Sequence, residues 1–168
     1  MKTYTFGKET VPVAIAKDII VGSVLEKNYK IMLARINGEE IVETRFLAGK
    51  NEWEGQGVAE LDDGYIIGGA VEGRATSDGG NGWKAYVARL DGSLDVLWKQ
   101  KIESRDNGVN RSVVPIGGAI FIAGETGKPD NKRFFIGRFS MNGELLWLRE
   151  FGCWEDDSLP LCSNPRMV

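Results

Sequence analysis

The sequence predicts an all-β chain in which one unit of four short antiparallel strands occurs three times. The clearest copy covers residues 64–98, where three apolar runs are separated by a polar loop and by the Asp91-Gly92 turn. Glycine is abundant, at 22 residues, and recurs where strands would end or turn. No segment keeps apolar residues at helical spacing across three turns, so we expect no helix.

The first unit follows a short alternating segment, residues 2–6, whose end Phe6-Gly7 is echoed by Phe151-Gly152. We therefore expect residues 2–6 to form an extra strand, equivalent to the last strand of a unit. Asn37-Gly38 is a hairpin signal, because both residues tolerate positive φ. The expected strands of the first unit are residues 11–16, 19–24, 31–36 and 41–46.

The second and third units repeat this order, with Asp91-Gly92 and Asn142-Gly143 in the place of the Asn37-Gly38 turn. A long glycine-rich loop, residues 73–82, occurs only in the second unit. The expected strands are residues 58–61, 65–71, 85–90 and 94–102 in the second unit, and residues 112–116, 120–124, 133–139 and 145–151 in the third.

Landmark residues support this alignment. A glycine recurs in the second strand of each unit, and a small residue followed by an arginine recurs in the third strand. The glycines are Gly22, Gly69 and Gly124, and the arginines are Arg35, Arg89 and Arg138. We interpret the arginines as a structural ladder; the alternative is a ring of positive charge that lines a central channel for an anion.

A period of about 40 to 50 residues with four strands per unit is typical of a propeller blade. Over residues 2–152 the chain resembles the β-propeller superfamily, especially quinoprotein-like and kelch-like repeats, through segments such as GGAIFIAG and AYVARLDGSLDVLW. The resemblance implies blades over residues 11–46, 57–102 and 111–151. The chain lacks the Trp-Asp dipeptide of WD repeats, a catalytic motif and a quinoprotein cofactor signature.

Three blades cannot close a ring, because propellers need about four to eight. Either two copies pair to give a six-bladed homodimer, or the chain is part of a longer protein. In the dimer, the strand over residues 2–6 would join the edge of a neighbouring blade. Residues 153–168 lose the repeat, and we expect an irregular tail that is a remnant of a longer ancestor or a cap on an open face.

Composition narrows the classes of partner. The formal net charge is -3 and no basic run occurs, so nucleic acid is not expected. The apolar runs are too short to cross a membrane, and the N-terminus lacks a signal-peptide pattern, so we expect a soluble, cytoplasmic protein. The scarcity of glutamine favours a thermophilic source.

The chain contains no histidine, which excludes Ser-His-Asp and Cys-His catalysis and histidine metal sites. The two cysteines, Cys153 and Cys162, lie in the tail; we expect free thiols, with a disulfide as the alternative. No phosphate-binding loop occurs. We therefore predict no catalytic residue, no metal and no cofactor.

A geometric argument points to a candidate site. In a four-stranded blade, the loop between the second and third strands and the connection to the next blade lie on one rim, which we call the loop-rich face. We expect this face to bind a small molecule or a protein, because tryptophan rings pack against sugars or cations and carboxylates bind amines or hydroxyls. The candidate ligand-binding residues are Glu52, Trp53, Glu54, Trp83, Asp106, Trp154, Asp156 and Asp157.

Other interpretations of these residues remain. In the interpretation that we favour, the tryptophans pack as plugs between blades and the carboxylates are solvated. Aromatic side chains that look exposed in a sequence are more often packed than functional. A carboxylate-based glycoside hydrolase or lyase is the alternative function; it needs two acids about 5 to 9.5 Å apart across a pocket, from Glu52 or Glu54 with Asp106, Asp156 or Asp157. An inert fragment, poorly soluble alone, is a third hypothesis.

Overall fold

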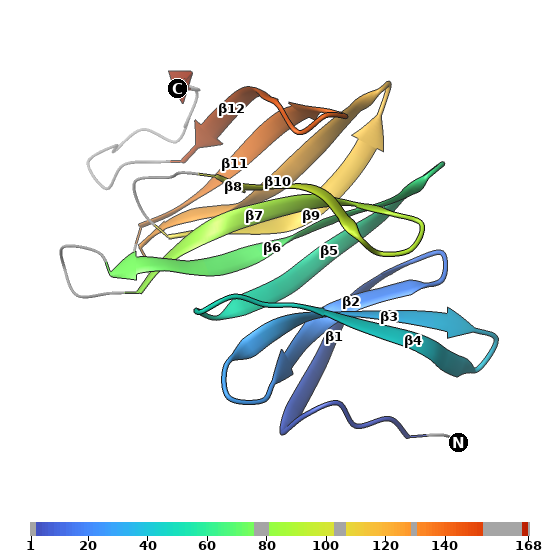
Figure 1. The fold of residues 1–168 in the computed structure, drawn as a ribbon. Helices are drawn as coiled ribbons and strands as arrows, with labels where there is room; N and C mark the ends of the chain where they lie inside the picture. Colours follow the sequence, from blue (N-terminus) through green and yellow to red (C-terminus); the bar gives the residue numbers. More distant parts are fainter. Residues whose placement is uncertain (1–2, 76–80, 103–106, 129–130, 153–165, 168) are drawn as a thin grey trace.

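The computed structural model describes residues 3–75, 81–102, 107–128, 131–152 and 166–167. The described strands form three antiparallel sheets, in each of which neighbouring strands follow chain order. The sheets succeed one another along the molecule from the N-terminal to the C-terminal end (Figure 1). The predicted three units of four antiparallel strands are confirmed, and the described residues contain no helix.

Two tight hairpin turns join the first to the second strand and the third to the fourth strand of the first sheet. Its strands are β1 (Glu9–Ala16), β2 (Ile19–Leu25), β3 (Tyr29–Asn37) and β4 (Glu40–Leu47). Lys17 in the first hairpin turn and Gly38 in the second have φ of 51° and 61°. Positive φ at a short turn matches the right-handed twist of paired strands, which is why the Asn-Gly pair marks a hairpin here.

Several strands of the second sheet are longer than the sequence predicts. Its strands are β5 (Trp53–Leu61), β6 (Gly64–Ala75), β7 (Asn81–Asp91) and β8 (Val96–Ile102). Trp53 and Glu54, which we expect in a connecting loop, belong to β5 and pair with Val71 and Ala70 of β6. The glycine-rich loop is correspondingly shorter than predicted, because β6 and β7 extend their hairpin into it.

The third sheet gains a strand from the C-terminal segment. Its strands are β9 (Gly108–Ile116), β10 (Ala119–Lys128), β11 (Asn131–Ser140) and β12 (Leu145–Phe151), followed by β13 (Arg166–Met167). β13 pairs with the outer edge of β12, so the last residues of the tail are not wholly irregular. Residues 3–6, expected as a strand, have no regular secondary structure.

The three recurring glycines have one packing reason. A Cβ atom at Gly22, Gly69 or Gly124 would lie 2.2, 2.0 or 2.1 Å from a carbonyl oxygen of the sheet's first strand. Each site adjoins a β-bulge in the pairing of the first two strands. The bulge brings the first strand against the second so closely that only glycine fits, which explains the spacing of these residues in the sequence.

Consecutive sheets pack face to face through apolar side chains. β5 lies against β1, β2 and β3 of the first sheet, and β9 lies in the same way against β5, β6 and β7. The first interface buries Ile19, Val21, Ile31, Leu33, Trp53, Tyr65, Ile67, Tyr86 and Leu90. The second buries Ile66, Val87, Ile102, Val113, Ile120, Ile122, Phe135, Phe139 and Leu148. The middle sheet is therefore covered on both faces.

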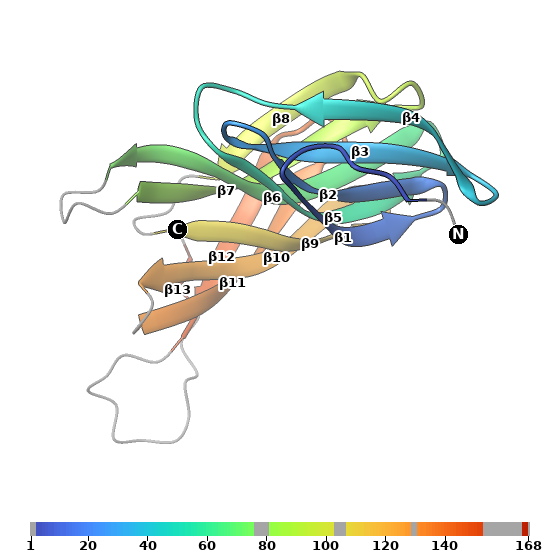
Figure 2. The same cartoon turned by 90° about the horizontal axis from the view of Figure 1, so that it is seen from below.

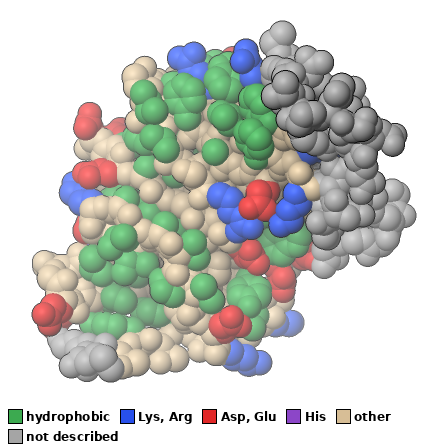
Figure 3. All heavy atoms as spheres, turned by 180° about the vertical axis from the view of Figure 1, so that it is seen from behind, with side chains coloured by type: hydrophobic (Ala, Val, Ile, Leu, Met, Phe, Trp, Pro, Cys, Tyr) green, Lys and Arg blue, Asp and Glu red, His purple; other side chains and the backbone are tan. Residues whose placement is uncertain are grey.

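The outer faces of the stack differ. On the first sheet, the N-terminal segment crosses the strands (Figure 2), and Phe6 packs against Val24, Met32 and Ala34. On the third sheet, Val114 and Phe134 remain 43% and 52% exposed. Hydrophobic side chains also lie at the surface of the end formed by the third sheet, beside basic ones (Figure 3). The chain itself covers part of the first sheet, although Ile15, Val42 and Phe46 of that sheet remain 60%, 55% and 39% exposed.

Candidate binding site

Trp53 of the loop-rich face is a core residue. Its side chain is 8% exposed, its ring centroid lies 5.1 Å from that of Tyr86 in an edge-to-face arrangement, and the Lys99 ammonium lies 5.6 Å from the ring. Trp53 also belongs to the apolar cluster that fills the space between the first and second sheets. The ring therefore offers little surface to a ligand, and it corresponds to the interpretation of a plug between blades.

Glu52, Glu54 and Trp83 are half-buried near the same rim. The backbone N–H of Glu52 donates to Oε2 of Glu72 over 3.4 Å, and the backbone N–H of Trp83 donates to Oδ1 of Asn107 over 2.9 Å. Oε2 of Glu54 accepts a 3.4 Å hydrogen bond from Gln56. These contacts join the rim to Glu72 of β6 and to Asn107, just before β9.

The other predicted ligand-binding residues are Asp106, Trp154, Asp156 and Asp157, and they lie outside the described residues, as do Cys153 and Cys162. The acid pair of a carboxylate-based enzyme requires one of these aspartates. Among the described residues, no group of three or more Asp, Glu, His or Cys is placed to hold a metal ion. The part of the chain that the structure describes has no helix long and apolar enough to cross a membrane.

The opposite rim, formed by the hairpin turns, carries a repeated contact around the arginine of each third strand. Arg35 of β3 donates from Nη1 to Oδ2 of Asp18, over 2.7 Å, in the first hairpin turn of its own sheet. From Nη2 it donates over 2.6 Å to the carbonyl of Gly92, in the β7–β8 turn of the second sheet. The arginine thus joins two sheets.

Arg89 of β7 makes the same pair of contacts one sheet further on. Nη2 donates over 2.6 Å to Oδ2 of Asp63, in the β5–β6 turn, and Nη1 donates over 3.0 Å to the carbonyl of Met141, in the β11–β12 turn. We call this arrangement the arginine clasp: a third-strand arginine bound to a carboxylate of its own sheet and to a turn carbonyl of the next. The ladder interpretation is confirmed for Arg35 and Arg89.

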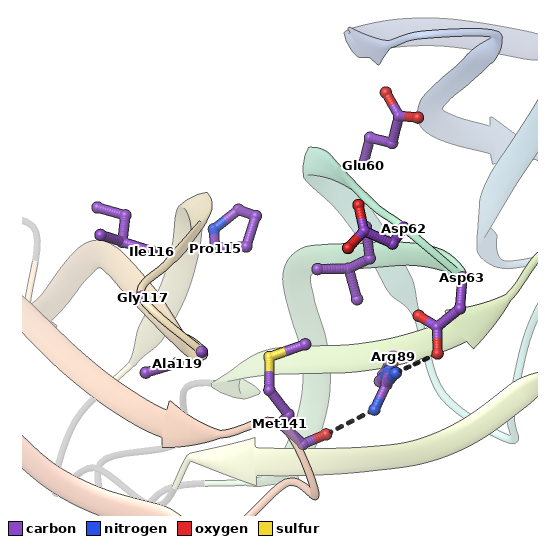
Figure 4. Close-up of a pocket in the computed structure, with 11 residues that line it drawn as sticks. Glu60, Asp62, Asp63, Arg89, Pro115, Ile116, Gly117, Ala119 and Met141 are labelled. Carbon is purple, nitrogen blue, oxygen red and sulfur yellow. Dashed lines mark hydrogen bonds and ion pairs between the residues drawn. The ribbon is translucent and has the colours of Figure 1, made fainter.

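A hollow of about 480 Å³ lies beside the second clasp, between the second and third sheets (Figure 4). Carboxylates of Glu60, Asp62 and Asp63 line one side, where Glu60 is paired with Lys17 and Asp63 with Arg89. The other wall is largely apolar, with Pro115, Ile116, Ala119 and Met141. Such a mixed wall suits a ligand that has a cationic group beside an apolar part.

The first clasp contains a coupled set of ionisable groups. The hydroxyl of Tyr65, in the second sheet, donates to Oδ1 of Asp18 in the first. This hydrogen bond and the Arg35 guanidinium lower the pKa of Asp18, although partial burial acts in the opposite direction. Burial, followed by the bond to Asp18, raises the pKa of Tyr65. At neutral pH the contact is therefore between a carboxylate, a guanidinium and a protonated phenol.

Arg138 of β11 occupies the equivalent place in the third sheet, where it pairs with Phe121 and Trp147. Gly118 stands at the turn position that Asp18 and Asp63 occupy in the other sheets. The Arg138 guanidinium lies 5.7 Å from the Phe121 ring centroid, and its Nε, like that of Arg89, is buried with no hydrogen-bond partner in the described part of the chain. Among the described residues, this third clasp has its donor and neither of its acceptors.

Sequence reasoning found the arginines and missed their partners. The signal was present, because an acidic residue stands at the second turn position of the first hairpin in two units and glycine stands there in the third. It was missed because the carboxylate and the arginine are separated by a full strand, and only the sheet register brings them together. An alignment of the turns would have identified the carboxylate partners at Asp18 and Asp63, and the missing partner at Gly118.

No protein-family model matches the chain, and the search of curated proteins gave no significant match. Function is therefore inferred from geometry alone.

Proposed function

We propose that the protein is a non-enzymatic binding scaffold of the β-propeller type, in which two chains join to form a six-sheet ring. The observation that carries the proposal is the repetition of one inter-sheet interface along the chain, with apolar face packing and an arginine clasp each time. Because the first and second interfaces use equivalent residues, a fourth sheet could pack on the third sheet in the same way. Two copies of three sheets fall within the range of about four to eight blades that propellers use.

The exposed side chains of the third sheet support pairing. Val114 and Phe134 of this face are 43% and 52% exposed. An apolar face of this kind gains free energy when another surface removes it from water, at about 25 cal/mol per Å² of apolar area. Closed two-fold symmetry is the commonest way in which soluble chains cover such surfaces.

The turn rim is the proposed place for a ligand. Its hollow of about 480 Å³ lies within the usual range of small-molecule sites, roughly 300 to 1,000 Å³. Asp62 is exposed there, and the apolar Met141 and Pro115 lie opposite the carboxylates (Figure 4). We propose amines that carry an apolar group, or a basic side chain of a protein partner, as the class of ligand.

Molar mass in dilute solution, by light scattering on a sizing column, tests the ring. We expect a mass twice that of the 18.5 kDa chain, at protein concentrations above the dissociation constant. A monomer at every accessible concentration, or an open series of larger species, would contradict a closed two-chain ring.

Titration with tryptamine, followed by amide chemical shifts, tests the binding role. We expect shifts at Ala119 and Met141, no such shifts with indole-3-acetate, and weaker binding of tryptamine to the Asp62→Asn variant. Asp95→Asn, on an exposed turn outside the hollow, is the matched control. Equal binding by all three proteins, or no shift at the hollow, would remove the ligand proposal and leave the ring proposal intact.

A further inference from the structure

The arginine clasp predicts what the third sheet binds. In both complete clasps, the carbonyl acceptor lies at the same place in the next sheet, three residues after the arginine of that sheet's third strand. Arg35 binds the carbonyl of Gly92, three residues after Arg89, and Arg89 binds the carbonyl of Met141, three residues after Arg138. The equivalent carbonyl of the first sheet belongs to Gly38, three residues after Arg35. Gly38 is exposed in the β3–β4 turn.

Donor and acceptor thus stand at opposite ends of the stack. Arg138 lies on the outer face of the third sheet and Gly38 lies in the first sheet, and these two are the end sheets of the row that the described residues form. A single chain cannot bring them together, because the second sheet lies between the first and the third. A second copy of the chain carries both missing halves.

We propose that the outer face of the third sheet docks on the outer face of the first sheet of a second copy, and that Arg138 donates to the Gly38 carbonyl of that copy, which forms the inter-sheet half of the clasp. This inference rests on the proposed two-chain ring and specifies its interface. Two-fold symmetry then forms the contact twice, so that every sheet has a neighbour on both faces. The apolar contact is made by Phe121, Phe134, Ile136 and Trp147 of the third sheet, around Arg138.

The N-terminal segment competes with this docking. Phe6 covers Val24 and Met32 on the outer face of the first sheet, and the Tyr4 hydroxyl accepts a 3.2 Å hydrogen bond from the backbone N–H of Ile41. A sheet of a second copy would occupy the same surface. Residues 3–7 must therefore move when the copies dock, because Phe6 covers part of that face.

The deciding experiment compares Arg138→Gln with a matched control in the full chain. Arg45→Gln is the control, because Arg45 is an exposed arginine of β4 that lies on the side of the first sheet facing the second. Loss of one charge-assisted hydrogen bond to a carbonyl weakens association about tenfold, and the symmetric dimer loses two. We expect R138Q to raise the dimer dissociation constant about 100-fold, and R45Q to change it less than threefold.

A second variant tests the competition. Deletion of residues 2–7 removes Tyr4 and Phe6 and should lower the dimer dissociation constant by about tenfold or more, because docking no longer displaces them. In that truncated background, R138Q should again weaken the dimer, which excludes a dimer formed merely by exposed apolar surface. Circular dichroism verifies that each variant keeps its strands.

Each outcome decides between the two proposals. A wild-type dimer that R138Q and R45Q affect equally would overturn this interface and leave the ring proposal standing. Monomers for the wild type and for the truncated chain would overturn both. A monomeric wild type whose truncated form makes a dimer dependent on Arg138 would support the interface and the competition together.

Discussion

Single residues fix how closely the strands of each sheet approach. Gly69 lies against the Glu54 carbonyl at the bulge between β5 and β6, and Gly22 and Gly124 repeat this contact in the other sheets. The arginine clasps act at the same scale between sheets, with one side chain bound to a carboxylate and to a carbonyl. The bulge contact requires glycine, which has no Cβ, and the clasp requires arginine, whose guanidinium can donate to two partners at once.

Gly69→Ala should destabilise the protein by about 3 kcal/mol or more, because the new Cβ would lie 2.0 Å from a backbone carbonyl oxygen. Gly92→Ala is the matched control, since its nearest neighbour would be 4.0 Å away, and we expect a change of at most about 1 kcal/mol. Urea unfolding followed by tryptophan fluorescence measures both. Equal effects of the two substitutions would show that the bulge relaxes.

Asp18→Asn should destabilise the protein at pH 7 by about 1 kcal/mol, because the Tyr65 and Arg35 partners of the carboxylate lose its charge. The pKa of Asp18 is lowered by folding, so its contribution is complete above its usual pKa and is lost as pH falls through the folded value. The difference between wild type and variant should therefore shrink below about pH 4.

Unfolding curves from pH 7 down to pH 2.5 measure this dependence. A difference in the free energy of unfolding that stays constant across the range would mean that the carboxylate charge does not contribute. Asp95→Asn, at an exposed turn residue, should show neither the loss at pH 7 nor the pH dependence.

At the scale of an element, the early start of β5 matters most. The strand begins at Trp53 and carries that ring into the interface between the first and second sheets, where it meets Tyr86. The hydroxyl of Tyr86 is buried without a hydrogen-bond partner among the residues that the structure describes, and burial raises its pKa strongly. The Trp53–Tyr86 pair therefore packs at the edge of this interface, where β5 begins.

Trp53→Ala should reduce the free energy of unfolding by about 3–5 kcal/mol, as expected for an aromatic side chain removed from a core. Trp83→Ala, at a half-buried position, should cost about 1 kcal/mol. Calorimetric or urea unfolding separates the two. Comparable effects at both positions would mean that Trp53 is not the plug that its burial indicates.

At the scale of the whole molecule, the three sheets form a row in which the first and third each pack on the second. Ile66 and Ile67, which point to opposite faces of the middle sheet, are both 0% exposed. Stability in such a row is the sum of the sheets and the interfaces between neighbours. The middle sheet therefore has two interfaces and each outer sheet has one.

Hydrogen exchange should follow this arrangement. In dilute solution, below the dissociation constant of any dimer, amides of β6 and β7 should exchange most slowly, and those of β11 and β12 faster. Raising the protein concentration should slow exchange in β11 and β12 if their face docks on a second copy. Uniform exchange rates in all three sheets at high dilution would contradict a row of unequal sheets.

The fold class, the three units and nearly all the turns could be predicted from the amino-acid sequence, because those features follow from local periodicity and from residues that tolerate positive φ. The arginine positions could be predicted for the same reason, since they recur at one place in each unit. Strand ends were less predictable: Trp53 and Glu54 joined β5 because partners in β6 were available to them.

Which residues come into contact could not be predicted from the sequence and depends on how the sheets pack. The pairing of Asp18 with Tyr65, the burial of Trp53 and the placement of Phe6 over the first sheet each join segments that are distant in the chain or belong to different sheets. Local propensity carries no information on such contacts, because they depend on the register of strands and on the stacking of sheets. The unfilled clasp of Arg138 is visible only when the two complete clasps lie beside it.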